Sequence, residues 1–214
     1  MALEDTGPQN ALVCIVDDDA SVRDGLSRLL ESAGYRAVAY HNAQSFLAAP
    51  SPEGPACLLF DVRLPDLDGL QLQEHVAGLS RRPPIIFMTG HGTIPMSVRA
   101  IKSGAVEFLT KPIDSDVLLA TIEDALSMDR DQLVGQREEG SLQQRLDSLT
   151  PRENEVLRRV IAGPMIKQLA AALGTSEVTA KVHKRRVMEK MGARTLVELI
   201  HMAERLGIEA LPIK

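Results

Sequence analysis

The 214-residue chain has no tryptophan, and aromatic residues make up only 3% of it. Because 44% of its residues are hydrophobic, it has enough apolar side chains for buried cores, and these must be mostly aliphatic. It has only two cysteines, Cys14 and Cys57, and both fall inside predicted strands. We interpret them as buried free thiols of a protein in a reducing compartment.

Long apolar runs are also missing. No stretch approaches the roughly 20 apolar residues that a helix needs to cross a bilayer, so we predict no membrane partner. Residues 1–10 are polar and acidic and lack a secretory pattern. We therefore expect a cytoplasmic protein.

The formal net charge of -5 hides an uneven distribution. Residues 1–126 hold 17 acidic and 9 basic side chains, whereas residues 150–214 hold 7 acidic and 12 basic ones. An acidic first part and a basic tail indicate that only the tail meets a polyanion.

Polar residues stand at the ends of four short apolar runs. They are Asp17, Asp18 and Asp19 after 12–16, Asp61 after 57–60, Thr89 after 85–88, and Lys111 at the end of 106–110. Helix-length segments separate these runs, which is typical of parallel strands alternating with helices. The carboxyl ends of such strands share one crevice. Three carboxylates there favour a divalent metal, and the lysine and threonine suit a phosphoryl group.

The first part predicts five strand–helix units. Strands are expected at 12–17, 36–40, 56–61, 84–89 and 106–110, and helices at 20–33, 43–49, 69–79, 94–103 and 115–127. Gly34 and Gly104 fit the positions that end two of these helices. The following segment, 127–148, is polar and predicts a partly helical linker that is interrupted at Gly135 and Gly140. Because the segment also carries leucines, an alternative is that it pairs with the same segment of a second copy of the chain.

The tail predicts helices only. Thr150, followed by Pro151 and Glu153, forms a capping box for a helix that runs to about 162. Further helices are expected at 166–173, at 177–191 after the cap Ser176, and from 196 to about 206 after a second capping box at Thr195. Two helices joined by a tight glycine-containing turn predict a helix-turn-helix.

Four sequence runs in the first part and three in the tail match known families in order and spacing. They are Val16 to Asp19, Asp61 with Pro65 and Asp68 to Leu70, Met88 to Gly92, Phe108 to Pro112, Leu149 to Glu153, Lys167 to Ala170, and Thr179 to His183. The first part resembles a two-component response-regulator receiver domain, and the tail resembles the LuxR-type DNA-binding domain of FixJ/NarL-like regulators. The resemblance implies a five-stranded parallel, flavodoxin-like α/β receiver at 1–126. It also implies a linker at 127–148 and an all-α four-helix helix-turn-helix domain at 149–214.

The resemblance also implies the chemistry of the crevice. Asp61 is the phosphoacceptor for a histidine kinase. Asp18 and Asp61 bind Mg²⁺ directly with the backbone carbonyl of Arg63, and Asp17 acts mainly through a metal-bound water. The receiver then catalyses only its own phosphorylation and dephosphorylation and is not otherwise an enzyme.

Three more residues take family roles. Lys111 neutralises the transferring phosphoryl group, and its peptide bond to Pro112 is expected to be cis. Thr89 binds a phosphoryl oxygen, and Phe108 is a switch aromatic that turns inward when Thr89 moves. The alternative for Phe108 is a plain core residue.

Plain structural roles also fit several acids. Asp19 is interpreted as a cap of the first helix, and Asp66 and Asp68 as turn residues.

In the helix 177–191, Ala180, Val187 and Met191 form an apolar stripe that docks the helix. Family alignment predicts that Lys181, Val182 and Arg185 contact base edges. The predicted phosphate contacts are Lys184, Arg186, Lys190 and Lys167. A solvated charge run is the alternative. His183 is interpreted as a packed or capping residue.

One position departs from the family pattern. Ile166 opens the first helix of the motif where the family has asparagine, and an aliphatic side chain cannot cap a helix. Together with Pro164, it predicts a less well anchored helix and weaker DNA affinity; the alternative is a different start of this helix.

These observations predict a phosphorylation-activated transcriptional regulator. Its predicted partners are a cognate sensor kinase, promoter DNA, a second copy upon phosphorylation, and RNA polymerase. The two half-sites would lie about one helical turn apart. A phosphate-independent DNA binder is the alternative. An enzymatic or RNA-binding output is disfavoured, because the tail has no nucleophile–base pair and no stacking aromatics.

Overall fold

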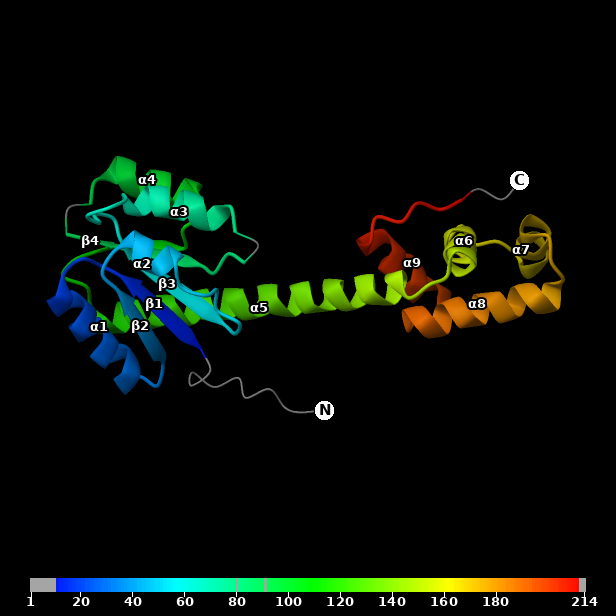
Figure 1. The fold of residues 1–214 in the computed structure, drawn as a ribbon, viewed down its shortest axis with the longest axis horizontal. Coiled ribbons are helices and arrows are strands. Elements are labelled where there is room, and N and C mark those ends of the chain that lie inside the picture. Colours follow the sequence, from blue (N-terminus) through cyan, green and yellow to red (C-terminus); the bar gives the residue numbers. More distant parts are fainter. Residues whose placement is uncertain (1–10, 80, 91, 212–214) are drawn as a thin grey trace. The chain divides into compact units, whose positions relative to one another are not determined.

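The computed structural model describes residues 11–79, 81–90 and 92–211 (Figure 1). The chain forms two compact units: the first ends at Leu133 and the second begins at Val134. His91 of one matched run and both chain ends lie outside the described residues.

The first unit is built on a parallel sheet with the strand order β2-β1-β3-β4-β5. Its strands are β1 (Leu12–Val16), β2 (Arg36–Tyr40), β3 (Ala56–Asp61), β4 (Ile85–Thr89) and β5 (Glu107–Thr110). Its helices are α1 (Ala20–Ser32), α2 (Ala43–Leu47), α3 (Gly69–Ala77), α4 (Ile94–Lys102) and the long α5 (Ser115–Asp147). The predicted five-stranded, flavodoxin-like receiver fold is confirmed.

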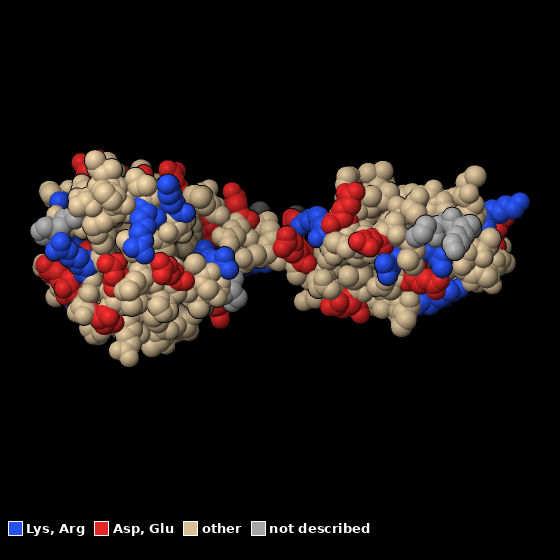
Figure 2. Space-filling view, turned by 90° about the horizontal axis from the view of Figure 1, so that it is seen from above, with Lys and Arg blue, Asp and Glu red and all other residues tan. Residues whose placement is uncertain are grey.

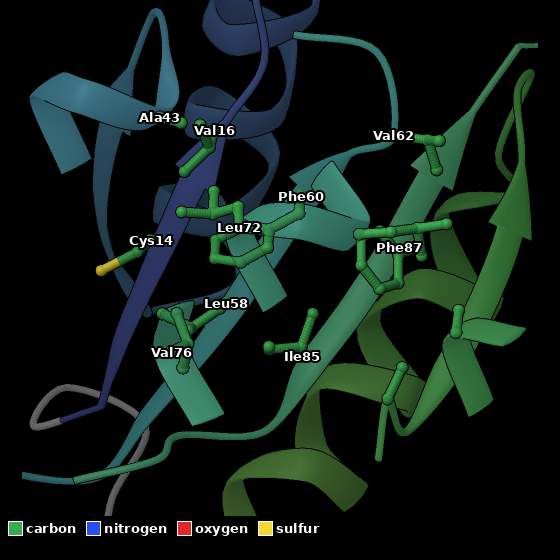
Figure 3. Packing of buried hydrophobic residues seen from close by; sticks show 13 residues of the cluster. Cys14, Val16, Ala43, Leu58, Phe60, Val62, Leu72, Val76, Ile85 and Phe87 are labelled. Atoms are coloured by element: carbon green, nitrogen blue, oxygen red, sulfur yellow. The ribbon is translucent and has the colours of Figure 1, made fainter. Parts of the chain in front are cut away.

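Two cores lie on opposite faces of this sheet, because successive strand side chains alternate between its faces. One core joins β1, β3 and β4 to α2, α3 and α4 (Figure 3); it includes Val16, Leu58, Phe60, Leu72 and Phe87. The other joins the alternate strand residues to α1 and α5; it includes Val13, Ile15, Leu59, Ile86, Leu30 and Ile122. Both sheet faces are thus covered, and the carboxyl edge of the strands is left as the place for a site.

The predicted helix ends at Gly34 and Gly104 are confirmed. Both residues have positive φ angles, 88° and 96°, in the region where a side chain would be strained.

The predicted breaks in the segment after residue 127 are wrong. Helix α5 runs without interruption from Ser115 to Asp147, through Gly135 and Gly140. Neither glycine has a positive φ, and the residues around them are mostly good helix formers. A glycine inside a helix costs about 1 kcal/mol relative to alanine, which weakens a helix without ending it.

The second unit holds the end of α5 and four short helices, as predicted. They are α6 (Pro151–Val160), α7 (Ile166–Leu173), α8 (Glu177–Met191) and α9 (Leu196–Arg205). A single aliphatic core joins them, with Val156, Leu157, Leu169, Val187, Met191 and Leu199 among its buried members.

The predicted capping box at Thr150 is present: Glu153 accepts from its backbone N–H, and Thr150 Oγ1 accepts from the N–H of Glu153. At Thr195 only half of the predicted box forms, because Glu198 accepts from the N–H of Arg194 instead. Across the described ranges, none of the helices is both long and apolar enough to cross a bilayer.

Candidate functional site

The carboxyl edge of the receiver sheet collects the polar residues singled out in the sequence. Asp61 is the last residue of β3, Thr89 is the last residue of β4, Asp17 directly follows β1, and Lys111 directly follows β5. Because all the strands are parallel, these four residues reach the same edge of the sheet.

Lys111 ties two of the carboxylates together. Its ammonium donates to Asp17 over 2.6 Å and to Asp61 over 2.9 Å. Asp17 is fully buried, whereas the Asp61 side chain keeps 12% of its surface exposed. The second oxygen of Asp61 accepts from the backbone N–H of Arg63 over 3.2 Å. Asp61 is therefore held in place and still reachable from solvent. The peptide bond between Lys111 and Pro112 is cis, as predicted.

The electrostatic balance of this cluster favours a further cation. Burial raises the pKa of Asp17, and the hydrogen bonds from Lys111 and the N–H of Asp19 do not fully offset it. Burial alone would lower the pKa of Lys111, but hydrogen bonds to Asp17 and Asp61 outweigh this effect and raise it. The single positive charge of Lys111 is thus shared by the carboxylates of Asp17 and Asp61, and it neutralises only one of their two negative charges.

A divalent metal fits the same residues. Asp17, Asp18 and Asp61 each offer a carboxylate oxygen, and these oxygens lie within 4.8 Å of one another. Asp18 is exposed, which leaves one side of the group open to water. Mg²⁺ is bound by a few carboxylates and keeps several waters, so this donor set suits it. The predicted contribution of the Arg63 carbonyl stays a prediction.

Three neighbouring acids have the structural roles expected of them. Asp19 caps α1 by accepting from the N–H of Ser21 over 2.8 Å. Asp68 caps α3, and Asp66 accepts from the N–H groups of residues 43 and 44 at the start of α2. These contacts hold the loops that border the crevice.

Sequence reasoning treated Gly69 only as part of a turn, but the structure places it against the backbone of Asp61. A Cβ at position 69 would lie 2.3 Å from the Asp61 carbonyl oxygen, and the Gly69 N–H donates to Val62 over 2.8 Å. Only glycine allows this approach. The dipeptide of Asp68 and Gly69 was the available sequence signal.

Thr89 and Phe108 lie close together on the neighbouring strands β4 and β5. Thr89 is buried, and Phe108 is half-buried, with its ring centroid 6.2 Å from that of Phe87. A Cβ built on Gly92 would meet both the Phe108 ring, at 2.8 Å, and the Thr89 methyl, at 3.0 Å. The two side chains therefore border the same small space. The residues needed for the predicted switch are adjacent.

In the second unit, α8 carries the cations expected of a DNA-reading helix. Its packing side is Ala180, Val187 and Met191, all buried as predicted. The predicted contact residues are exposed or half-buried: Lys181, Val182, Lys184, Arg185, Arg186 and Lys190 on α8, and Lys167 on α7. Figure 2 shows Lys and Arg side chains on the surface of the second unit, with Asp and Glu side chains among them.

A surface groove beside α8 contains a cation that sequence reasoning missed. Lys181, Lys184, Arg185 and Arg194 line it together with Ile166. Arg194 lies between the end of α8 and Thr195, the cap of α9. Because it belongs to the loop that joins two helices, nothing in the sequence indicated that it lies beside the cations of α8.

Lys190 differs from Arg185, whose partner Glu189 lies on the same helix, because its acceptors belong to other segments of the domain. Its ammonium donates to Glu153 over 2.6 Å and to the Ser148 carbonyl over 3.1 Å. The hydrogen bond from Lys190, followed by that from the Thr150 N–H, lowers the pKa of Glu153 to about 2. A phosphate contact by Lys190 stays a prediction, but the geometry gives this residue a structural role as well.

The start of α7 lacks a side-chain cap, as the sequence predicted. Met165 is the cap residue and makes no side-chain capping bond, and Ile166 instead packs partly on the core. Gln168 satisfies one free donor by accepting from the Met165 N–H over 2.9 Å. The helix is therefore anchored by packing and by half a capping box.

Another network missed by sequence reasoning is a buried ion pair at the opposite edge of the receiver sheet. Asp129 of α5, fully buried, accepts from Arg81 over 2.8 Å and from the N–H of Ala56 over 2.8 Å. Arg81 also donates to the carbonyls of Pro52 and Gly54. Residue 129, assigned to a linker, is therefore part of the receiver fold. Nothing in the composition of this polar segment marked one of its acids as buried.

Comparison with known proteins agrees with this organisation. Residues 13–123 match the family model of the response regulator receiver domain. Residues 147–203 match the model of bacterial regulatory proteins of the LuxR family. The two matches together cover most of the chain.

Similar proteins share both parts. The chain is 46% identical over 200 residues to Nodulation protein W of Bradyrhizobium diazoefficiens, covering 94% of this chain and 88% of that protein. It is 39% identical over 196 residues to the transcriptional regulatory protein FixJ of the same organism, covering 92% and 96% of the two chains. The solved structure of the response regulator StyR matches with a TM-score of 0.84 at 44% identity, covering 91% of this chain and 98% of StyR.

The chain thus belongs to the two-component response regulators in which a receiver domain is joined to a LuxR-type DNA-binding domain. It is a phosphorylation-activated transcriptional regulator, and its receiver domain implies a sensor kinase as partner, as its LuxR-type domain implies DNA.

Proposed function

We propose that Asp61 takes a phosphoryl group from the phosphohistidine of a sensor kinase in the cytoplasm. An Asp61 oxygen attacks the phosphorus, the new O–P bond forms, and the P–N bond breaks, leaving the electron pair on the histidine nitrogen. The observation that carries this proposal is the convergence of Asp17, Asp18, Asp61 and Lys111 at one sheet edge.

The residues around Asp61 divide the remaining work. Asp17, Asp18 and Asp61, with the backbone carbonyl of Arg63, would hold Mg²⁺, which supplies positive charge to the transferring phosphoryl group. The Lys111 ammonium, 2.9 Å from Asp61, is placed to donate to a phosphoryl oxygen. The same groups position water for loss of the phosphoryl group, so the receiver's only catalysis is on itself.

The signal leaves the site through Thr89 and Phe108. A phosphoryl group adds about -1.5 to -2 charges at one point, enough to bias a two-state element. Thr89 moves to donate its hydroxyl to a phosphoryl oxygen, and Phe108 turns into the space that Thr89 leaves. The shared border of the two side chains beside Gly92 supports this coupling.

The responding surface consists of 94–103, 106–110 and 115–127, and it forms a homodimer on phosphorylation. Exposed aliphatic residues support this proposal. Ile94, Val98 and Ile101 are 81%, 45% and 44% exposed and recur along one side of α4, and Val117 on α5 is 50% exposed. Apolar patches of this kind are typical of association surfaces.

The dimer then binds two half-sites of promoter DNA and contacts RNA polymerase. On α8, Lys181, Val182 and Arg185 contact base edges. Phosphates are bound by Lys184, Arg186, Lys167 and, as far as its internal partners allow, Lys190. The exposure of these side chains around α8 supports this assignment.

The deciding experiment compares wild type with Asp61→Asn, each with Mg²⁺ and with or without acetyl phosphate or beryllofluoride. Oligomeric state is measured by light scattering and duplex binding by fluorescence anisotropy. Asp24→Asn is the matched control, since Asp24 is an exposed acid on the neighbouring helix α1.

Wild type and the control should dimerise and bind DNA more tightly only after treatment, whereas Asp61→Asn should not respond. If all three proteins bind DNA equally under every condition, the receiver is not the switch, and phosphate-independent DNA binding replaces this proposal.

A further inference from the structure

The outward face of α8 carries two aliphatic side chains that the described part of the domain leaves exposed. Val178 is 73% exposed and Val182 is 44% exposed, and they lie one helical turn apart on the same side of the helix. The buried residues Ala180, Val187 and Met191 occupy the opposite side. The two valines therefore point away from the core of the domain.

The charges beside the valines indicate what covers them. Lys181 and Arg185 flank Val182 on the helix surface, and with Lys184 they line the basic groove next to α8. An apolar pair set among cations suits a surface that is polyanionic at its edge and has methyl groups within reach. The major groove of duplex DNA has this chemistry, since phosphates border it and one base carries a methyl group.

The position along the helix points the same way. Ser176 caps α8, and its side chain accepts from the N–H of Thr179, so Val178 lies in the first turn of the helix. In helix-turn-helix proteins the N-terminal residues of the recognition helix contact base edges. Val178 thus lies closer to the N-terminus of α8 than Lys181, Val182 and Arg185, the residues assigned to base-edge contacts by family alignment.

Only thymine presents a C5-methyl group in the major groove, and aliphatic side chains contact it without a hydrogen bond. We propose that Val178 and Val182 recognise thymine methyl groups and so set a preference for A·T pairs at two positions of the site that α8 reads. Lys181 and Arg185 beside them suit the O6 and N7 acceptors of guanine. This inference rests on duplex-DNA binding by the second unit, and it adds Val178 as a specificity-determining residue.

The test begins with the full-length protein, treated with Mg²⁺ and beryllofluoride, selecting binding duplexes from a randomised pool. In the selected duplex, each preferred thymine is then replaced by deoxyuridine, which removes only the methyl group. The dissociation constants of the two duplexes are compared for wild type, Val178→Ala and Val182→Ala. Val197→Ala is the matched control, since Val197 is 61% exposed but lies on α9.

Burial of one methyl group contributes about 0.8 kcal/mol, which corresponds to about a fourfold change in affinity. Wild type and Val197→Ala should therefore lose about fourfold at each contacted thymine when it is replaced by deoxyuridine. Each of the other two variants should lose this penalty at one position while keeping it at the other. Thermal melting checks that all the variants are folded.

Equal affinity of wild type for thymine and deoxyuridine duplexes overturns the inference. The inference is also overturned if Val178→Ala and Val182→Ala both lose as much affinity as wild type at every thymine that is replaced by deoxyuridine. In either case sequence-specific DNA binding itself stands. A protein that enriches no duplex from the pool overturns the inference and DNA reading by α8 together, so the two failures are distinguishable.

Discussion

The receiver crevice and the surface of α8 are both proposed to act on phosphate groups, but they are built in opposite ways. In the crevice, Asp17 is fully buried and shares the ammonium of Lys111 with Asp61. On α8, Arg185 is 79% exposed and pairs with the exposed Glu189. Transfer of one phosphoryl group requires charges held at fixed positions out of water. Binding a long polyanion requires cations that are free to meet it. Function should therefore depend on backbone geometry in the receiver and on individual side-chain charges in the second unit.

The largest effect should come from Gly69→Ala. Its Cβ would lie 2.3 Å from the Asp61 carbonyl oxygen and would displace the proposed phosphoacceptor. A shift of about 1 Å at a reacting group costs about 100-fold in rate, so phosphorylation by acetyl phosphate should fall by about that factor. Gly25→Ala is the control, because a Cβ there meets nothing within 4 Å. Equal rates for the two variants would show that the approach of Gly69 to Asp61 is not needed.

On the second unit, Lys184→Ala should weaken DNA binding about tenfold, since a hydrogen bond to a charged group contributes about 1.5–3 kcal/mol. Because Lys184 is proposed to contact a phosphate, the slope of log affinity against log salt concentration should fall by about one, with no change in sequence preference. Arg194→Ala should behave similarly, as Arg194 lines the same groove. A changed sequence preference in Lys184→Ala would instead place this residue at a base edge.

Glu153→Gln should lower the stability of the second unit near pH 7, because Glu153 accepts from both Lys190 and Thr150. The folded protein holds the pKa of Glu153 at about 2, below its ordinary value of 4.5. Its contribution is therefore fully present above pH 4.5 and is lost as the pH falls from there toward 2.

Urea unfolding of wild type and Glu153→Gln between pH 7 and 3 measures this, and the difference between them should shrink on acidification. Glu189→Gln is the control, since its pair with Arg185 is exposed on both sides and should contribute little. A difference between wild type and Glu153→Gln that does not change with pH would assign the effect to packing.

The smallest effect should come from Gly135→Ala or Gly140→Ala, each of which should stabilise α5 by about 1 kcal/mol or less. Both glycines lie inside a continuous helix, and a Cβ at either meets nothing within 4 Å. Gly174→Ala should do the reverse, because its φ of +65° strains any side chain. Chemical denaturation compares the three. A loss of stability in the α5 variants would mean that these glycines serve a bent form of the helix.

Several features of the receiver follow from the residue pattern alone. The apolar runs ending in Asp17, Asp61, Thr89 and Lys111 predicted parallel strands, and strand direction alone places such ends at one edge. In the tail, Gly174 and Gly192 predicted the ends of α7 and α8, and Ser176 predicted the start of α8. These signals are local, so they can be read along the chain.

Other features depend on what distant segments bring together. The pairing of Asp129 with Arg81, the approach of Gly69 to Asp61 and the internal partners of Lys190 all join residues that no spacing rule connects. The continuity of α5 was also missed, because glycine weakens a helix without fixing where it ends.

The sequence by itself determined the two-part organisation, the strand and helix order, and most of the acids and cations at each functional surface, because periodicity, caps and strand direction act over short stretches of chain. Only the tertiary structure decided which of those charges are buried, which are already paired, and which apolar side chains are left uncovered, because burial and pairing depend on neighbours far away in the sequence.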